Sequence, residues 1–376
     1  MKDNTKSGIL DSNIISVGII IFLIGICGCF AIYNSTLENQ HSIFFTLKQL
    51  AWVGIGVVIY FIAANIPFSY YKKYILPISI IAWLLIIIVL IIGKKHNGMT
   101  GWIILLNQPF TIFLQPAEIA KPIFILIMAA VCCKYHSEPK RFIFLILCYA
   151  VWIIPILLEP DYGTASVYTA GFIIIYWIGG GKKSYFLFLI IAFILLGATI
   201  IYLKPYVLQR IMGFLFPLEH SQSSGWHILQ FRNAIQHGGM TGAGMGKAYW
   251  ANNYLPLAHS DSIFASIVES AGYIISVLIP LAFLSIFFFL YCHFKKAGNK
   301  FIYIFSIGLA GIITFQALLH IGVNIGFLPP TGITLPFISY GGSSMISTML
   351  SVGMIVSSIE YIKNRKLSKS KDSLSI

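Results

Sequence analysis

Residues 75–93 read ILPISIIAWLLIIIVLIIG, a run without a single charged side chain. Lys72 and Lys73 precede this run, and Lys94 and Lys95 follow it. An α-helix needs about 20 mostly apolar residues to cross the hydrocarbon core of a bilayer. The stretch therefore predicts a membrane-spanning helix with a basic residue pair at each end.

The composition extends this prediction to the whole chain. Of its 376 residues, 58% are hydrophobic and 10% are charged, and the mean hydropathy is +0.85. Soluble domains carry about 25% charged residues, and much of any soluble surface must meet water. These numbers exclude a soluble globular protein. The six cysteines lie inside apolar runs or at their ends, without metal-ligand spacing, and are interpreted as small core residues without a disulfide.

Apolar runs recur along the chain and predict an all-α polytopic membrane protein with ten spanning helices, organised as one membrane domain over residues 1–376. The first run is too long for the apolar part of a signal peptide and is interpreted as a span that the protein keeps. The ten expected spans are residues 13–33, 49–66, 75–93, 112–132, 141–158, 164–179, 185–203, 262–292, 301–326 and 337–362.

The positions of Lys and Arg predict the orientation. Most of them, from Lys2 and Lys6 at the start to the tail at 363–376, fall on segments that an N-inside, C-inside topology places in the cytoplasm. The net charge of +13 is therefore interpreted as a topology signal and as an attraction to anionic membrane lipid, not to nucleic acid. The tail is rich in Ser and Lys and is expected to be disordered.

The longest segment between spans, about 204–261, is predicted to be a large extracytoplasmic loop between the seventh and eighth helices. A long loop on one face is a usual place for a substrate-handling site. Its run HGGMTGAGMGK (237–247) lacks the phosphate-binding Gly-Lys-Ser/Thr pattern, so we expect tight turns in which backbone approaches backbone or substrate. The loop has several His but no metal-binding spacing, and no metal site is predicted.

Glu118 and Lys121 are ionisable residues inside a predicted span. Their spacing places them on one face of a helix, where each can partly neutralise the other. Ionisable groups in a span are costly unless they are paired or hydrated. Two interpretations stay open: a structural ion pair that locks two helices, or a pair at the base of a water-filled cleft that positions substrate.

Two further acidic motifs lie near span ends. In LLEPDYGTA, Glu159 and Asp161 are either solvated acids in a helix-end turn, or Asp161 contributes to binding a cation or sugar hydroxyls. In YLPLAHSDSIFASIVESAG, Asp261 is either an N-terminal helix cap, as Ser260 could also be, or a general base for a sugar hydroxyl.

The segment GFLPPTGITLPFISYGGSSM (326–345) combines prolines, glycines and serines. Such residues interrupt helices, and irregular backbone at membrane depth is tolerated where it is buried in protein or lines a cavity. The segment is interpreted either as a structural re-entrant loop or as part of a site.

Five motifs together resemble the SEDS family (shape, elongation, division and sporulation), the bacterial membrane proteins that include RodA and FtsW. They follow one another in the family's order over nearly the whole chain: GW and QPAEIAK (101–121), EPDYGTA (159–165), Arg210 with GW and AIQHGGMTGAGMG (225–246), LPLAHSDSIFASIVESAG (255–272) and TGITLPFISYGGSS (331–344). The resemblance implies a ten-helix glycosyltransferase of the bacterial cytoplasmic (inner) membrane. Such an enzyme polymerises lipid II into the growing glycan strand of peptidoglycan on the outer face, together with a class B penicillin-binding protein. It implies no certain cofactor, with a divalent cation as the one candidate.

The resemblance also implies residue roles. Asp261 matches the acidic residue that family members require and is the predicted catalytic carboxylate. Arg210 matches an Arg of the family's large loop and is interpreted as a contact for the pyrophosphate. The other predicted substrate-binding residues are Trp102, Lys121, Glu118, Lys247, Glu269, Asp161 and Ser339. The chain departs from the family where Thr100 and Gly101, not Arg, precede Trp102, which suggests a divergent member.

Three functional alternatives follow. A RodA-like role in cell elongation and shape is favoured by the short tails and the PPTGI sequence, whereas the YLPLAH stretch also fits an FtsW-type division polymerase. A lipid II flippase or transporter would need an inner vestibule, for which the inner loops are too short. A non-catalytic scaffold would not need Asp261.

Overall fold

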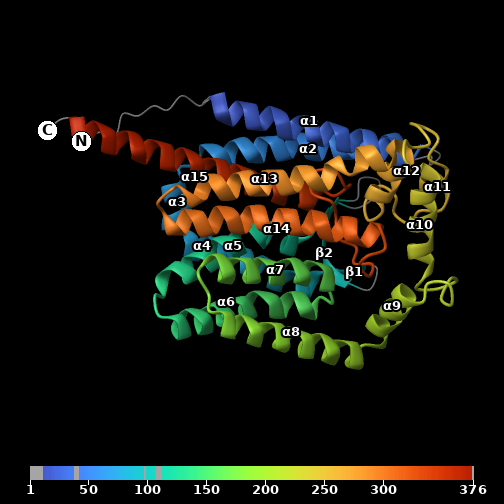
Figure 1. Cartoon of the computed structure of the whole chain (residues 1–376), viewed down its shortest axis with the longest axis horizontal. Helices are drawn as coiled ribbons and strands as arrows, with labels where there is room; N and C mark the ends of the chain where they lie inside the picture. Colours follow the sequence, from blue (N-terminus) through green and yellow to red (C-terminus); the bar gives the residue numbers. More distant parts are fainter. Residues whose placement is uncertain (1–11, 38–41, 97–98, 107–111, 375–376) are drawn as a thin grey trace.

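The computed structural model describes residues 12–37, 42–96, 99–106 and 112–374. Lys2 and Lys6, which support the N-inside prediction, lie outside these ranges. The described part is a bundle of long, roughly aligned helices (Figure 1). The helices before the 204–261 segment are α1 (Ser12–Ser35), α2 (Ser42–Asn65), α3 (Phe68–Lys73), α4 (Ile75–Ile92), α5 (Pro116–Lys134), α6 (Glu138–Leu158), α7 (Tyr162–Ile178) and α8 (Lys183–Leu203). Those that follow are α9 (Pro205–Leu215), α10 (Trp226–Gly238), α11 (Tyr249–Asn253), α12 (Ile263–Ser276), α13 (Leu278–Lys295), α14 (Lys300–Asn324) and α15 (Gly342–Leu374).

The prediction of a polytopic helical membrane protein is confirmed. Within the described residues, nine helices are long and apolar enough to cross a bilayer, and they are α1, α2, α4, α5, α6, α8, α13, α14 and α15. The helix α7 is apolar but shorter, at 17 residues. The expected total of ten spans stays a prediction.

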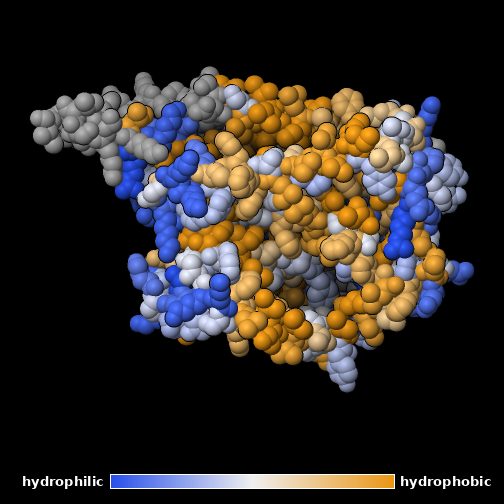
Figure 2. Space-filling model, viewed as in Figure 1, coloured by the Kyte–Doolittle hydropathy of each residue, from blue (hydrophilic) through white to orange (hydrophobic). Residues whose placement is uncertain are grey.

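The sides of the bundle are apolar, as a lipid-facing surface requires. In the view of Figure 2, hydrophobic residues cover the middle of the molecule and hydrophilic residues gather at its two ends. Exposed leucines and isoleucines on α4 and α8 belong to this surface, whereas α5 and α14 are largely buried. The core between α5, α7 and α14 contains fully buried aromatic rings, among them Phe124, Tyr168 and Phe305.

The all-α prediction is wrong at one place, because a three-stranded antiparallel sheet lies between α4 and α5. Its strands are β1 (Lys94–His96), β2 (Met99–Leu106) and β3 (Ile112–Leu114), in the order β1-β2-β3. Trp102 pairs with Lys94 in β1, and Ile103 pairs with Leu114 in β3. The expected span at 112–132 therefore begins as a strand, and its helix starts at Pro116, where a proline is tolerated because the first helical N–H needs no partner.

The expected single span at 262–292 is also wrong, since the apolar run is divided into α12 and α13. Gly272 lies inside α12 with φ +80, a conformation that only glycine adopts readily. Hydropathy alone cannot detect this break, because both halves are apolar.

The 204–261 segment is not an irregular loop but contains α9, α10 and α11. Together with α12, these helices lie at the end of the bundle opposite to α3 (Figure 1). The glycine-rich run after α10 pairs with α12 through main-chain hydrogen bonds, including Ala243 N to Glu269 O (2.8 Å) and Tyr273 N to Gly239 O (3.0 Å). A Cβ at Gly242 would lie 2.3 Å from the Ser270 carbonyl oxygen. The prediction that this run lets backbone approach backbone is therefore confirmed.

The disorder expected for the tail is wrong as well. The helix α15 continues without a break through the last span and the tail to Leu374. Extending an existing helix avoids the cost of nucleation, and Lys, Arg and Ser do not stop it.

Candidate active site at the loop end of the bundle

Asp261 lies just before α12, and its side chain is partly exposed. The N-terminal cap of α12 is Ser262, whose side chain makes no capping hydrogen bond, so Asp261 does not act as the cap. Its carboxylate faces a glycine: a Cβ built at Gly332 would lie 3.5 Å from Asp261 Oδ2. The acid is therefore partly exposed and is bounded by the 329–341 loop.

Arg210 on α9 is the cation that acts on this acid. Its guanidinium lies 3.4 Å from the Pro330 carbonyl oxygen, in the same loop. Burial raises the pKa of the Asp261 carboxyl above 3.8, while a hydrogen bond from Ser260 and the charge of Arg210 both lower it. The carboxyl is thus more basic than an ordinary Asp, which suits a group that accepts a proton.

The main chain around Asp261 is fixed by side chains from two other segments. Ser339 Oγ donates to the Ser260 carbonyl oxygen and accepts from Leu335 N, both at 2.8 Å. Asn324 on α14 donates to the Asp261 carbonyl oxygen at 2.9 Å and accepts from Ala265 N at 3.0 Å. These bonds fix the main chain at residue 261 and at the residue before it.

His259 fills the space beside this turn. Its ring stacks on Phe45 with 4.5 Å between ring centroids, and its carbonyl oxygen accepts from Tyr340 N at 2.9 Å. Burial lowers the pKa of His259 to about 4, so the imidazole is neutral at physiological pH. It acts as a packing element, not as a cation.

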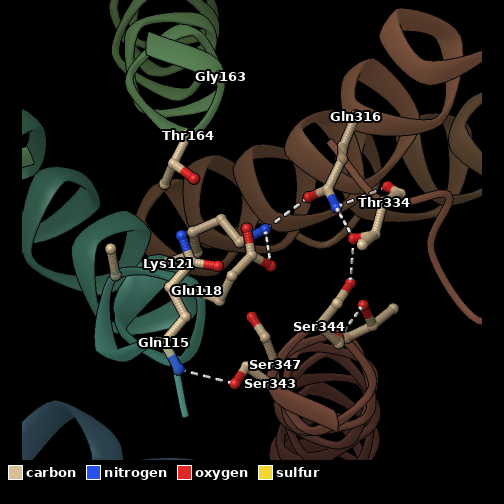
Figure 3. A network of polar contacts seen from close by, with 12 residues as sticks. Gln115, Glu118, Lys121, Gly163, Thr164, Gln316, Thr334, Ser343, Ser344 and Ser347 are labelled. Atoms are coloured by element: carbon tan, nitrogen blue, oxygen red, sulfur yellow. Dashed lines mark hydrogen bonds and ion pairs between the residues drawn. The ribbon is translucent and has the colours of Figure 1, made fainter. Parts of the chain in front are cut away.

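A second polar cluster lies deeper in the bundle, around Glu118 and Lys121 (Figure 3). The Lys121 ammonium contacts Glu118 Oε2 at 2.7 Å and Gln316 Oε1 at 2.5 Å. Gln316 then donates to the Thr334 carbonyl oxygen at 3.0 Å, and Thr334 Oγ1 donates to Ser344 Oγ at 2.7 Å. The side chains come from α5, α14, α15 and the 329–341 loop, so the ion pair joins three helices and this loop.

The start of α5 is tied to two further elements in the same region. Gln115 N donates to Ser343 Oγ at 2.9 Å, and Gln115 Nε2 donates to Asp161 Oδ2 at 2.7 Å. The other oxygen of Asp161 accepts from Thr164 N at 2.9 Å, which caps α7. Both oxygens of Asp161 are thus occupied by protein donors.

The 329–341 loop is the wall shared by the two clusters. Gly332 and Pro330 face Asp261 and Arg210, whereas Thr334 takes part in the Lys121 network. His320 on α14 contacts the loop: its Nδ1 lies 2.6 Å from the Ile333 carbonyl oxygen. A change in either cluster can therefore shift the position of this loop.

Glu159 is the unusual group of the site. It is 1% exposed, and within the described residues neither carboxyl oxygen has a hydrogen-bond partner. Burial, with a smaller contribution from Asp161, raises the pKa of Glu159 from 4.5 to about 8. The simpler expectation for this motif, solvated acids in a helix-end turn, is wrong, because Asp161 is also 4% exposed.

Gly101 on β2 explains how the sheet lies against this acid. A Cβ at Gly101 would come within 2.7 Å of Glu159 Oε2. The next residue, Trp102, is partly buried and packs edge-on against Phe113 of β3 with 6.1 Å between centroids. Gly101 of the divergent Gly101-Trp102 pair therefore lies directly against Glu159, the residue that follows α6.

Two predicted substrate contacts lie apart from these clusters. Glu269 is fully buried and accepts from Trp250 N and Ala251 N at 2.8 and 2.7 Å, with His237 Nδ1 at 2.8 Å. Its geometry supports α10 and α11. Lys247 is exposed in the glycine-rich run, and no contact in the described ranges joins it to Asp261.

Gln316, His320 and Asn324 on α14 were not predicted as site residues from the sequence. They are spaced four residues apart in an apolar run, which places three polar side chains on one stripe of a helix. That spacing was a usable signal. In the part of the chain that the structure describes, no group of three His, Cys, Asp or Glu could hold a metal ion.

Comparisons with known proteins agree with this architecture. Residues 12–364 match the family model of FtsW, RodA and SpoVE, described as cell cycle protein. The chain is 32% identical to the "probable peptidoglycan glycosyltransferase FtsW" of Coxiella burnetii, over 82% of this chain and 85% of that protein. It is 30% identical to the stage V sporulation protein E of Bacillus subtilis, over 91% and 96% of the two chains.

Solved structures with lower identity share the fold. A chain from a peptidoglycan synthase complex, whose study concerns the coordination of polymerization and crosslinking, superimposes with a TM-score of 0.75 at 23% identity, covering 92% of this chain and 96% of that one. The rod shape determining protein RodA of Thermus thermophilus gives a TM-score of 0.66 at 22% identity, with 92% and 95% covered. By the extent of the family match and the identity to these relatives, the chain belongs to the FtsW, RodA and SpoVE family of cell cycle proteins.

Proposed function

We propose that this protein is an inverting glycosyltransferase that polymerises lipid II into glycan strands of peptidoglycan at the outer face of the bacterial cytoplasmic membrane. The observation that carries the proposal is the Asp261 carboxylate, partly exposed beside Arg210 and bounded by Gly332. The curated relatives named peptidoglycan glycosyltransferase support the reaction class.

In the proposed reaction, Asp261 accepts the proton of the GlcNAc 4-hydroxyl of the acceptor lipid II. The hydroxyl oxygen attacks the anomeric carbon of the growing chain, a new glycosidic bond forms, and undecaprenyl pyrophosphate leaves with the electrons of the broken bond. The proton then passes from Asp261 to solvent. Burial supports the acceptor role, because it raises the pKa of the carboxyl.

Arg210 stabilises the negative charge that develops on the departing pyrophosphate. A guanidinium offers several donors to phosphate oxygens, and its bond to the Pro330 carbonyl oxygen holds it at the loop that also bounds Asp261. Lys247 extends the positive potential of this face, and Trp102 offers an aromatic surface to a sugar or to the lipid. A divalent cation, the one candidate cofactor, would enter with the pyrophosphate; activity after EDTA treatment and Mg²⁺ addition tests this.

In this scheme Lys121 and Glu118 position the 329–341 loop, because Lys121 joins Glu118 to Gln316, which in turn donates to the Thr334 carbonyl oxygen. The membrane contributes by holding both prenyl chains, which converts an encounter in solution into one between neighbours. The proposed partner is a class B penicillin-binding protein that cross-links the strands, and the structural likeness to a chain of a peptidoglycan synthase complex supports it.

The test is polymerisation of labelled lipid II by the purified protein with its partner, comparing the wild type with Asp261→Ala. Glycan strands from the wild type and none from the variant are expected. Equal strand formation by both would overturn the assignment of Asp261. Movement of labelled lipid II across vesicles without polymer would support the flippase, and polymer that appears only through the partner's own activity would support the scaffold.

The proposed cellular role is cell elongation and shape, which the PPTGI sequence favours. A division role is the second candidate, because curated relatives at 32% identity are named FtsW. Expression in bacteria depleted of either their elongation or their division member distinguishes the roles by which defect is rescued.

A further inference from the structure

A cavity of about 330 Å³ lies at the end of the bundle opposite to Asp261. Its lining residues come from α3, from the start of α14 and from Tyr361 of α15. Its volume lies at the small end of the range of about 300–1,000 Å³ that is usual for ligand pockets. The residues that line it are Phe68, Ser69, Lys72, Lys73, Asn299, Phe301, Ile302 and Tyr361.

The charge of the cavity is positive. Lys72 and Lys73 are exposed and line its mouth, and none of the lining residues is acidic. The neighbouring acid in sequence, Glu360, contacts Lys363 at 3.7 Å. The positive end of the α14 helix dipole points to the same place, because Asn299 caps this helix. Three independent sources of positive potential therefore converge on one small cavity.

The floor of the cavity is apolar and preformed. Phe68 packs against Phe301 and Tyr361 with 5.9 and 6.0 Å between ring centroids, and it is 2% exposed. A free phosphate ion would gain nothing from this aromatic floor. A molecule with a phosphodiester head and an apolar body would contact both parts.

The position of the cavity along the bundle suits such a molecule. The helix α3 connects the end of α2 to the start of α4. The helix α14 begins at Lys300 on the same side of the bundle (Figure 1). Hydrophilic residues gather at this end of the molecule beside the apolar middle (Figure 2). The cavity is therefore at the height of the lipid head groups, where basic pockets between helices recognise anionic lipids.

We propose that this cavity is a binding site for the head group of an anionic phospholipid. Lys72 and Lys73 contact the phosphodiester, and the rings of Phe68, Phe301 and Tyr361 contact the glycerol and the first acyl carbons. The site is separate from the proposed glycosyltransferase site and does not depend on it.

The experiment uses the full-length protein in nanodiscs made from equal amounts of phosphatidylglycerol and phosphatidylcholine, followed by native mass spectrometry of the retained lipid. The wild type is expected to retain about tenfold more phosphatidylglycerol than phosphatidylcholine. The double variant Lys72→Ser, Lys73→Ser is expected to lose this preference. The matched control is Lys182→Ser, Lys183→Ser, an exposed lysine pair elsewhere on the surface, which is expected to keep it.

A second variant separates the cavity from its charge. Ser69→Trp keeps both lysines and fills the space between them, so it is also expected to lose the preference; thermal unfolding checks that each variant is folded. Equal retention by all variants, or an equal loss in both lysine doubles, would overturn the proposal. Displacement of the lipid by inorganic phosphate at millimolar concentration would overturn it in favour of a free phosphate site.

Discussion

The carboxylates of Asp261 and Glu118 lie in two clusters that share the 329–341 loop, and their surroundings are opposite in kind. Glu118 is 7% exposed and is paired with Lys121, which also contacts Gln316. Asp261 has a partly exposed side chain, and it is its main chain that the protein holds, through Asn324 and the neighbouring Ser260 carbonyl.

This difference separates support from chemistry. A buried ion pair is costly to disturb, because removing one partner leaves an uncompensated charge inside the bundle. A carboxylate that is fixed by its backbone and reachable from outside can exchange a proton. Variants of Asp261, Glu118, Lys121 and Ser339 distinguish the supporting role from the chemical role.

The largest effect is expected for Asp261→Asn. Loss of a general base lowers the rate by about 10²–10⁴-fold, whereas the main-chain bonds of residue 261 are kept, so thermal stability is expected to stay near that of the wild type. Initial rates of lipid II polymerisation and thermal unfolding measure both. The control Glu219→Gln changes an exposed acid of the same segment; a variant of Asp261 that polymerises at the control's rate would refute the chemical role.

Lys121→Met is expected to destabilise the protein by about 3–5 kcal/mol, because it leaves the buried Glu118 carboxylate without its cation. Adding Glu118→Gln removes the uncompensated charge and is expected to restore much of the stability. Thermal unfolding of the two single variants and the double variant measures this. A double variant as unstable as the sum of the singles would show that the two groups do not act as a pair.

Ser339→Ala is expected to lower the polymerisation rate about tenfold, since a buried hydrogen bond contributes about 0.5–1.5 kcal/mol and a donor and an acceptor lose their partner here. The effect should appear in kcat more than in KM, because the bonds position Asp261 and do not contact the substrate. Ser285→Ala, an exposed serine on α13, is the control. An unchanged kcat in Ser339→Ala would remove the positioning role.

The smallest effect concerns pH. The Asp261 carboxyl must be ionised to accept a proton, and its pKa is raised by burial, so kcat/KM is expected to fall on acidification with a midpoint above 3.8. Arg210 lowers that pKa, so Arg210→Gln should move the midpoint to higher pH by less than about one unit. Arg232→Gln is the control. A midpoint shifted to lower pH would contradict the electrostatic assignment.

The helical bundle was predictable because long apolar runs have few alternatives in a membrane. The sheet was not predictable from the sequence. Residues 112–114 are apolar and could form part of a helix or a strand, and their pairing with β2 decides for the strand. The break at Gly272 was hidden inside an apolar run. At the site, Asp261, Arg210 and the Glu118–Lys121 spacing were visible in the sequence, but Gln316, His320 and Asn324 require knowledge of which face of α14 meets the 329–341 loop.

Glycines at the contact between α10 with its following run and α12 set how closely these two main chains approach each other. At Gly238, Gly242 and Gly272, an added Cβ would lie 2.3, 2.3 and 2.4 Å from main-chain carbonyl oxygens of the opposite segment. Any larger residue would act as a wedge and push α12, and with it Asp261, away from its present position. The position of the Asp261 carboxylate relative to the 329–341 loop therefore depends on glycines, because only residues without a Cβ allow the two main chains to lie this close.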